Sequence, residues 1–194
     1  MSLELCENDF ATFLRALQYA ARCHANQLRK GSKHAPYINH PIGLVVELWQ
    51  TSGVRDINTL VAALLHDTIE DTDARPDDIR DQFGEVVLNL VLEMTDDKSL
   101  PKAERKRLQV VNAPHKSPQA RQIKLADKIN NVYEIAMDPP SDWSLARRRE
   151  YLDWANQVIN GLRGQNPALE ARFDAVLAQA RELLAGDEKK PAQN

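Results

Sequence analysis

The sequence has few of the features that mark secreted, membrane-spanning or nucleic-acid-binding proteins. Its only cysteines, Cys6 and Cys23, form no CxxC or zinc-knuckle pattern, and the first residues lack the basic and apolar regions of a signal peptide. The longest apolar run, Leu60 to Leu65, is far too short to cross a bilayer. The net charge is −3, so no overall positive field attracts nucleic acid or an anionic membrane. These absences predict a reduced, cytoplasmic protein with no nucleic-acid or membrane partner.

Strand signals are also missing, because no segment alternates apolar and polar side chains between hairpin turns. Helix signals are frequent instead. A capping residue stands before an early proline at Ser99, Ser117 and Asn166, and each is predicted to start a helix. Further helices are predicted from about Asn8, Pro41, Asp56, Pro76, Glu85 and Ser144. The predicted fold class is all-α, a single bundle of about eight to ten helices.

The length of 194 residues, of which 43% are hydrophobic, suits one globular domain with a sizeable core. We assign residues 1–186 to this domain. The polar sequence GDEKKPAQN after Ala185 predicts a disordered tail, assigned to residues 187–194. A second large domain would not fit in the chain.

The run from Leu60 to Leu65 has no polar face, which predicts a helix at the centre of the bundle. Two pairs of polar residues follow at once, His66 with Asp67 and Glu70 with Asp71. In a continuous helix these side chains would form two adjacent columns over one turn. An unpaired buried carboxylate would cost several kcal/mol or become protonated. A divalent cation would compensate the charges, and a solvated acidic loop is the alternative.

Two other segments favour the cation. His40 precedes Pro41, which places its imidazole at the entrance of a helix. In IKLADKINNVYEI, Asp127 and Asn131 lie four residues apart beside an apolar stripe. The candidate metal ligands are therefore His40, His66, Asp67 and Asp127. Two nitrogen and two oxygen ligands without sulfur suit Mn, Fe or Zn better than Ca.

Four segments in this order resemble a known family: RKGSKHAPYINHP, ALLHDTIEDT, MTDDKSLPKAERKRLQ and IKLADKINN. They resemble the hydrolase domain of RelA/SpoT proteins, within the HD superfamily of metal-dependent phosphohydrolases. The resemblance runs from about Ala20 to Leu152. Since the chain has no room for synthetase and regulatory domains, it is most similar to the stand-alone small alarmone hydrolases, the group of the metazoan SpoT homologue.

The resemblance implies an enzyme of the stringent response that removes the 3′-pyrophosphate of guanosine tetra- or pentaphosphate (ppGpp or pppGpp). The products would be GDP or GTP and pyrophosphate. The implied cofactor is Mn²⁺, with Fe, Zn or Mg as other divalent ions. By the same resemblance, Glu70 and Asp71 would position and deprotonate the attacking water. The implied substrate-binding residues are Arg29, Lys30, Asn131, Lys102, Arg147 and Tyr151.

Other readings stay open at this point. An HD phosphohydrolase could act on another phosphorylated nucleotide, for example the 2′-phosphate of NADPH. A non-catalytic HD domain could bind a nucleotide and signal, although such domains tend to lose a ligand or the water-activating pair. The sequence also leaves open a homodimer, because Ala-rich faces around Ala178, Ala180 and Ala185 could pack within the chain or against a copy.

Overall fold

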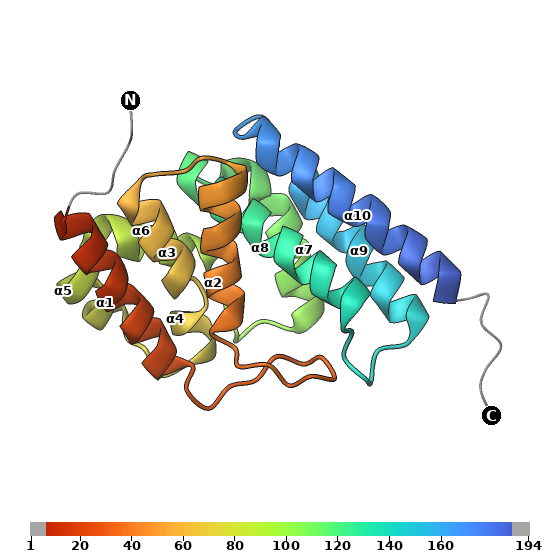
Figure 1. Cartoon of the computed structure of the whole chain (residues 1–194), viewed down its shortest axis with the longest axis horizontal. Helices are drawn as coiled ribbons and strands as arrows, with labels where there is room; N and C mark the ends of the chain where they lie inside the picture. The colour runs from red at the N-terminus through yellow and green to blue at the C-terminus, as the bar shows by residue number, and fades with distance from the viewer. Residues whose placement is uncertain (1–6, 188–194) are drawn as a thin grey trace.

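The computed structural model describes residues 7–187, which form a bundle of helices (Figure 1). The α-helices are α1 Glu7–Cys23, α2 Asn39–Val46, α3 Ile57–Leu65, α4 Thr68–Asp71, α5 Pro76–Phe83, α6 Glu85–Met94, α7 Lys102–Asn112, α8 Pro118–Met137, α9 Leu145–Asn160 and α10 Pro167–Asp187. A π-helical turn, Glu47–Thr51, extends α2, and a 3₁₀ turn, Ala113–His115, follows α7. Within residues 7–187 no strand forms, and one isolated bridge joins Leu28 to Pro36. The all-α prediction is confirmed.

Most predicted helix starts are found where the sequence placed them, and four carry a side-chain cap. A cap oxygen accepts the backbone N–H three residues later at Asp56 (α3), Ser117 (α8), Ser144 (α9) and Asn166 (α10). Pro76 and Glu85 begin α5 and α6 as predicted. Local sequence therefore determines where these helices begin.

The predicted start at Ser99 is wrong, because α7 begins at Lys102 and has no side-chain cap. The backbone N–H and the hydroxyl of Ser99 both donate to Oδ1 of Asp97, at 2.9 and 2.6 Å. This local turn holds the serine outside the helix, where its hydroxyl caps nothing. The segment between α6 and α7 is consequently longer than the sequence suggested.

Helix α3 lies at the centre of the bundle, as predicted. Every residue from Thr59 to Leu65 is buried, and α1, α2, α6 and α8 all pack against this helix. Helix α8 buries the predicted stripe of Ile123, Ala126, Ile129 and Val132, and α10 packs along it. In Figure 1, α1 to α6 form one half of the molecule and α8 to α10 the other. The two halves meet where α2 and α3 contact α8.

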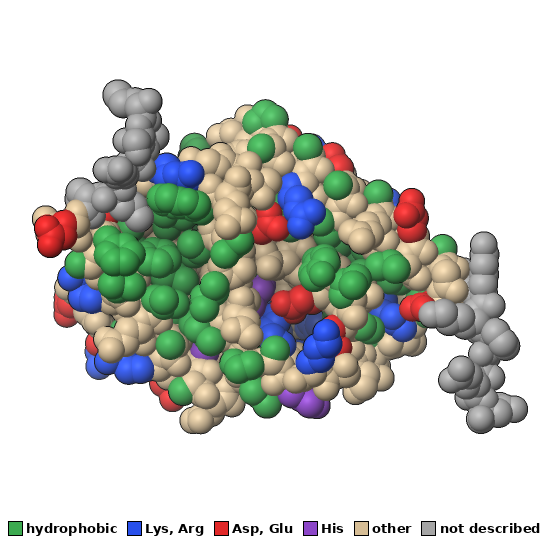
Figure 2. Space-filling view, in the orientation of Figure 1, with side chains coloured by type: hydrophobic (Ala, Val, Ile, Leu, Met, Phe, Trp, Pro, Cys, Tyr) green, Lys and Arg blue, Asp and Glu red, His purple; other side chains and the backbone are tan. Residues whose placement is uncertain are grey.

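The visible face of the molecule divides into an apolar part and a charged part (Figure 2). Hydrophobic side chains cover the region over α1, where Phe10 and Leu14 are exposed, whereas charged side chains surround a hollow nearer the middle. None of the helices in residues 7–187 combines the length and the apolar character needed to cross a membrane. Helix α10 extends to Asp187, where the tail was expected to start, and residues 188–194 of that predicted tail lie outside the described residues.

Candidate metal centre and its surroundings

The histidine and aspartate that follow the central helix lie at a break in it. The expected continuous helix is wrong, because α3 ends at Leu65 and α4 starts at Thr68. The Thr68 hydroxyl donates to the carbonyl oxygen of Leu65 at 2.7 Å, and Nδ1 of His66 lies 2.9 Å from the carbonyl oxygen of Ala63. Side chains thus take carbonyls that the next helical turn would have used. The two predicted columns of side chains do not form, and His66 and Asp67 occupy the turn between the helices.

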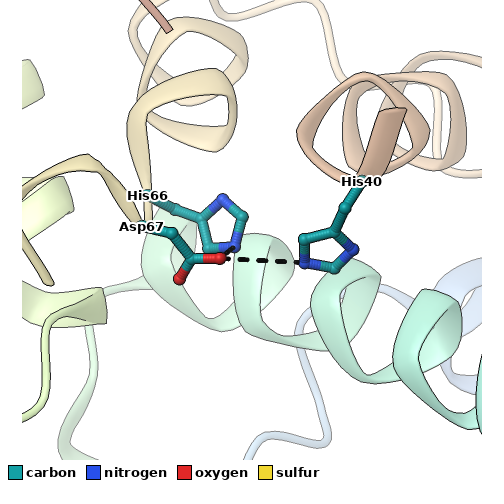
Figure 3. Close-up of side chains that lie close together, drawn as sticks. All are labelled: His40, His66 and Asp67. Atoms are coloured by element: carbon teal, nitrogen blue, oxygen red, sulfur yellow. Dashed lines mark ion pairs between the residues drawn. The ribbon is translucent and has the colours of Figure 1, made fainter. Parts of the chain in front are cut away.

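Three side chains from two helix ends converge at this break (Figure 3). Nε2 of His66 lies 2.8 Å from Oδ2 of Asp67, and Nε2 of His40, on α2, lies 3.9 Å from the same oxygen. One ligand atom from each residue lies within 4.8 Å of the others. Both imidazoles are buried. The fourth predicted ligand, Asp127 on α8, adjoins the group, with its Oδ1 3.3 Å from Nε2 of His40.

The donor atoms of this cluster suit a divalent metal ion. Since Nδ1 of His66 faces a carbonyl, it carries the proton that donates there, which leaves the lone pair on Nε2. That Nε2 is buried and has no hydrogen-bond partner within residues 7–187, although it faces a carboxylate oxygen of Asp67. Two acceptor atoms at this distance require a cation, either a proton or a metal. Nitrogen and oxygen ligands without sulfur indicate a divalent metal rather than a soft ion.

Electrostatics keep the acidic groups of the cluster ionised. Without a metal, burial alone would raise the pKa of Asp67, but protonated His66 and His40 lower it below its usual range. The Asp67 carboxylate in turn raises the pKa of His66 against the effect of burial, so a proton occupies the place that a metal would take. Burial also opposes ionisation of Asp127, yet Lys128 and His40 hold the pKa of this carboxyl well below its usual range. Burial lowers the pKa of His40, which favours its neutral form. Ionised carboxylates and neutral imidazole are the forms that bind metal.

Tyr37 is part of this cluster, and the sequence analysis did not single it out. Its hydroxyl donates to Oδ2 of Asp67 at 2.5 Å, and its ring stacks on His24 with 4.7 Å between centroids. Burial and the nearby Asp67 carboxylate raise the pKa of Tyr37, so the hydroxyl stays a donor. The available signal was its position in PYINHP, three residues before His40.

Glu70 and Asp71, on α4, are held by the segment that leads into α7. Oε2 of Glu70 accepts the backbone N–H of Asp96 at 2.9 Å, and Nη1 of Arg105 lies 3.9 Å from its Oε1. Asp71 accepts a hydrogen bond from the ammonium of Lys98. Burial and the Asp96 carboxylate raise the pKa of Glu70. A carboxyl with a raised pKa is a better proton acceptor than an ordinary glutamate.

The segment between α1 and α2 brings Arg29 to α8. Its guanidinium donates to Oδ1 of Asn131 at 2.8 Å and to Oε2 of Glu134 through Nε at 2.7 Å. Nδ2 of Asn131 in turn donates to Oδ1 of Asp127 at 2.5 Å. The predicted pair of Arg29 and Asn131 is thus in direct contact, and it adjoins the histidine–aspartate cluster through Asp127. Glu134 was not predicted to take part.

The remaining predicted substrate residues lie at different distances from this cluster. Tyr151, on α9, packs against Trp143 and Trp154, with 5.6 and 5.3 Å between ring centroids, and burial and the Asp127 carboxylate raise its pKa. Arg147 lies further out, where its guanidinium stacks 4.4 Å from the Trp143 ring centroid. Lys30 and Lys102 are exposed, and their side chains form no hydrogen bond or ion pair with other residues in the range 7–187. The structure does not bring these two lysines to the cluster.

A cavity of about 910 Å³ opens on the side of the cluster formed by Glu70 and Asp71. Arg22, at the end of α1, and Gln27, in the segment that follows it, also line the cavity. Pockets of ~300–1,000 Å³ are typical for small ligands. The carboxylate pair is therefore reachable from outside the protein.

Comparisons with known proteins agree on one family. The family profile described as HD domain matches residues 16–153. Guanosine-3′,5′-bis(diphosphate) 3′-pyrophosphohydrolase MESH1 of Homo sapiens is 51% identical over 172 residues, which cover 89% of this chain and 96% of the relative. The protein of the same name from Drosophila melanogaster is 46% identical over 169 residues, covering 87% and 94%.

The fold is shared with a solved structure. That structure, described as a metazoan ortholog of SpoT that hydrolyzes ppGpp and plays a role in starvation responses, matches with a TM-score of 0.86. The two chains are 46% identical, and the match covers 89% of this chain and 97% of the other. The similarity thus extends over most of both chains rather than over one motif.

Proposed function

This chain belongs to the HD domain family, and from that premise we propose that it hydrolyses the 3′-pyrophosphate of ppGpp or pppGpp. The products are GDP or GTP and pyrophosphate. The observation that carries the proposal is 51% identity, over 89% of the chain, to a relative named for this reaction. The cluster of His40, His66 and Asp67 at the end of the central helix supports it, because hydrolysis of a phosphate ester needs charge neutralisation on the phosphoryl oxygens.

The proposed ligands are His40, His66, Asp67 and Asp127, and the proposed ion is Mn²⁺. Two imidazoles and two carboxylates suit Mn²⁺, while Fe, Zn and Mg remain outcomes of a metal analysis. When bound, such an ion supplies Lewis-acid polarisation of water and of the phosphoryl oxygens. The residues that would hold it come from α2, from the end of α3 and from α8.

Glu70 and Asp71 are the proposed proton acceptor and water-orienting pair. The oxygen of water forms a bond to the phosphorus that carries the 3′ oxygen, and the bond between that phosphorus and the 3′ oxygen breaks. Glu70 takes the proton of the water, for which its raised pKa is suited. The 3′ oxygen leaves as the hydroxyl of GDP or GTP after it receives a proton that Glu70 returns through water, and pyrophosphate departs with the oxygen from the attacking water.

The substrate is held on the other side of the cluster. Arg29 presents a fork of donors, and Asn131 offers an amide one turn from Asp127. Tyr151 and Arg147 provide an aromatic and a cationic surface on α9 for the nucleoside. Lys30 and Lys102 are exposed in this structure, so contact with substrate requires their flexible side chains to turn toward it.

Two substitutions test these roles against each other. We expect Asp67→Ala to lose bound metal and ppGpp turnover together. We expect Glu70→Gln to keep its metal and lose about 10²–10⁴-fold in kcat, the usual range for a general base. Glu182→Gln, at an exposed position on α10, is the matched control. Metal content by mass spectrometry and kcat for ppGpp are the two measurements, and near-full turnover by Glu70→Gln would contradict the proton-acceptor role.

A further inference from the structure

Helix α8 buries two lysines beside the metal cluster. Lys124 and Lys128 are only 5% and 4% exposed. Lysine is rarely buried to this degree unless it is paired, because removing an ammonium group from water is costly. Two such residues on one helix therefore need compensation by negative charge.

The compensation within the protein is incomplete. Nζ of Lys128 lies 3.0 Å from Oδ2 of Asp127, whereas the side chain of Lys124 has neither a hydrogen bond nor an ion pair with any described residue. Burial and the charge of Lys128 lower the pKa of Lys124. The carboxylates of Asp127, Asp96 and Asp67 raise that pKa, but none of them forms a hydrogen bond or ion pair with the Lys124 side chain. A metal bound by Asp67 and Asp127 would draw on the same carboxylates.

Helix α7 presents two more cations to the same region. Nζ of Lys106 lies 4.7 Å from the ring centroid of Trp154, and Nζ of Lys128 lies 4.6 Å from the same centroid. Nε of Arg105 is buried and lacks a hydrogen-bond partner among residues 7–187. Since Arg105 also approaches Glu70, the cationic region borders the proposed proton acceptor.

We propose that Lys124, Lys128 and Lys106 form a pocket for the pyrophosphate group of the substrate, between α7 and α8. An anion with several charges matches three neighbouring ammonium groups, of which only Lys128 has a carboxylate partner, better than an anion with fewer charges does. The pocket thereby selects a two-phosphate group over one phosphate. This inference rests on the proposed function and names the residues that set its specificity.

The test is calorimetric titration of Mn²⁺-loaded protein with inorganic pyrophosphate and, separately, with orthophosphate. We expect Lys124→Met to weaken pyrophosphate binding about tenfold or more, as loss of a charge-assisted contact does. Orthophosphate affinity should change less than about twofold, and the melting temperature should not fall, because an unpaired buried charge is removed. Lys33→Met, at an exposed position, is the matched control. Lys106→Met, on α7, should also weaken pyrophosphate binding.

The possible outcomes test the pocket and the proposed hydrolysis independently of each other. Unchanged pyrophosphate affinity in Lys124→Met, with ppGpp still hydrolysed by the wild type, would overturn the pocket alone. Equal losses for pyrophosphate and orthophosphate would overturn its selectivity. Pyrophosphate binding that depends on Lys124, in a wild-type protein without ppGpp turnover, would support the pocket and overturn the proposed function.

Discussion

At the scale of single residues, Oδ2 of Asp67 is the atom that the other side chains of the cluster contact or approach. It lies 2.8 Å from Nε2 of His66 and accepts a hydrogen bond from Tyr37, while His40 approaches it from α2. A partner that hydrogen-bonds a ligating carboxylate fixes its orientation and tunes its charge. Tyr37 holds that place, and it is itself stacked on the buried His24.

We therefore expect Tyr37→Phe to weaken Mn²⁺ binding about 10–100-fold, the usual cost of losing such a partner. The ring and its stacking on His24 remain, so the melting temperature of the metal-free protein should change little. Competition with a chromogenic chelator gives the dissociation constant. Tyr133→Phe, at an exposed tyrosine of α8, serves as control. Equal metal affinities for Tyr37→Phe and the wild type would show that the hydroxyl does not support the ligand.

His40, His66 and Asp67 could be predicted as metal ligands from the sequence, because their residue types and their positions next to predicted helix ends can be read from it directly. Tyr37 was not found, since the partner of a hydroxyl depends on how the segment between α1 and α2 folds back. The buried lysines were missed for a related reason. Lys124 and Lys128 flank Asp127 in a motif that is typical of the charged edge of a helix, and they are buried because other helices, α9 among them, pack around α8.

At the scale of helices, the site depends on how closely α2 approaches α8. The two helices lie close together at Gly43, where an added Cβ would lie 2.5 Å from Oδ1 of Asn130. Asn130 is itself anchored, because its amide donates to the carbonyl oxygen of Ala126 at 3.1 Å. His40 on α2 and Asp127 on α8 are brought together by this contact.

Gly43→Ala should push the two helices apart and weaken Mn²⁺ binding, with a loss of about 1–3 kcal/mol in the free energy of unfolding from overpacking. Urea denaturation and chelator competition measure the two effects. Asn130→Ala, combined with Gly43→Ala in one chain, should restore part of the Mn²⁺ affinity and part of the free energy of unfolding. A double-mutant cycle measures the coupling between the two positions. Gly186→Ala, where a Cβ meets no atom within 4 Å, is the control. Unaltered metal affinity in Gly43→Ala would mean that the approach of α2 does not set the ligand geometry.

Helix boundaries show what local sequence can and cannot determine. Caps at Asp56, Ser117 and Ser144 were predictable, because each oxygen bonds to an amide three residues away. The break at His66 was not predictable from periodicity, since the apolar pattern continues up to it. The buried carbonyl of Leu65 accepts from the Thr68 hydroxyl, and this competition between side chain and backbone ends α3.

At the scale of the whole molecule, the proposed metal joins the two halves of the bundle. Its ligands come from α2 and the end of α3 in one half and from α8 in the other. The cluster holds two buried carboxylates, Asp67 and Asp127, which a bound cation would stabilise further. We therefore expect folding and metal binding to be coupled.

Removal of the metal should lower the melting temperature. Ligand at 100 times its dissociation constant stabilises the folded state by about 2.7 kcal/mol, so chelation should remove an effect of that order. Thermal unfolding with excess Mn²⁺ and with chelator measures it. Asp67→Ala is the control and should show no such difference. An equal shift in that variant would assign the stabilisation to metal bound elsewhere.

The most direct test of the account is product analysis by anion-exchange chromatography. Purified protein is incubated with ppGpp, with and without Mn²⁺, and with NADPH in parallel, and GDP, pyrophosphate and orthophosphate are resolved. The account predicts Mn²⁺-dependent release of GDP and pyrophosphate in equal amounts, and loss of both with Asp67→Ala. Metal-loaded protein that leaves ppGpp intact, or that releases orthophosphate from NADPH instead, would contradict it.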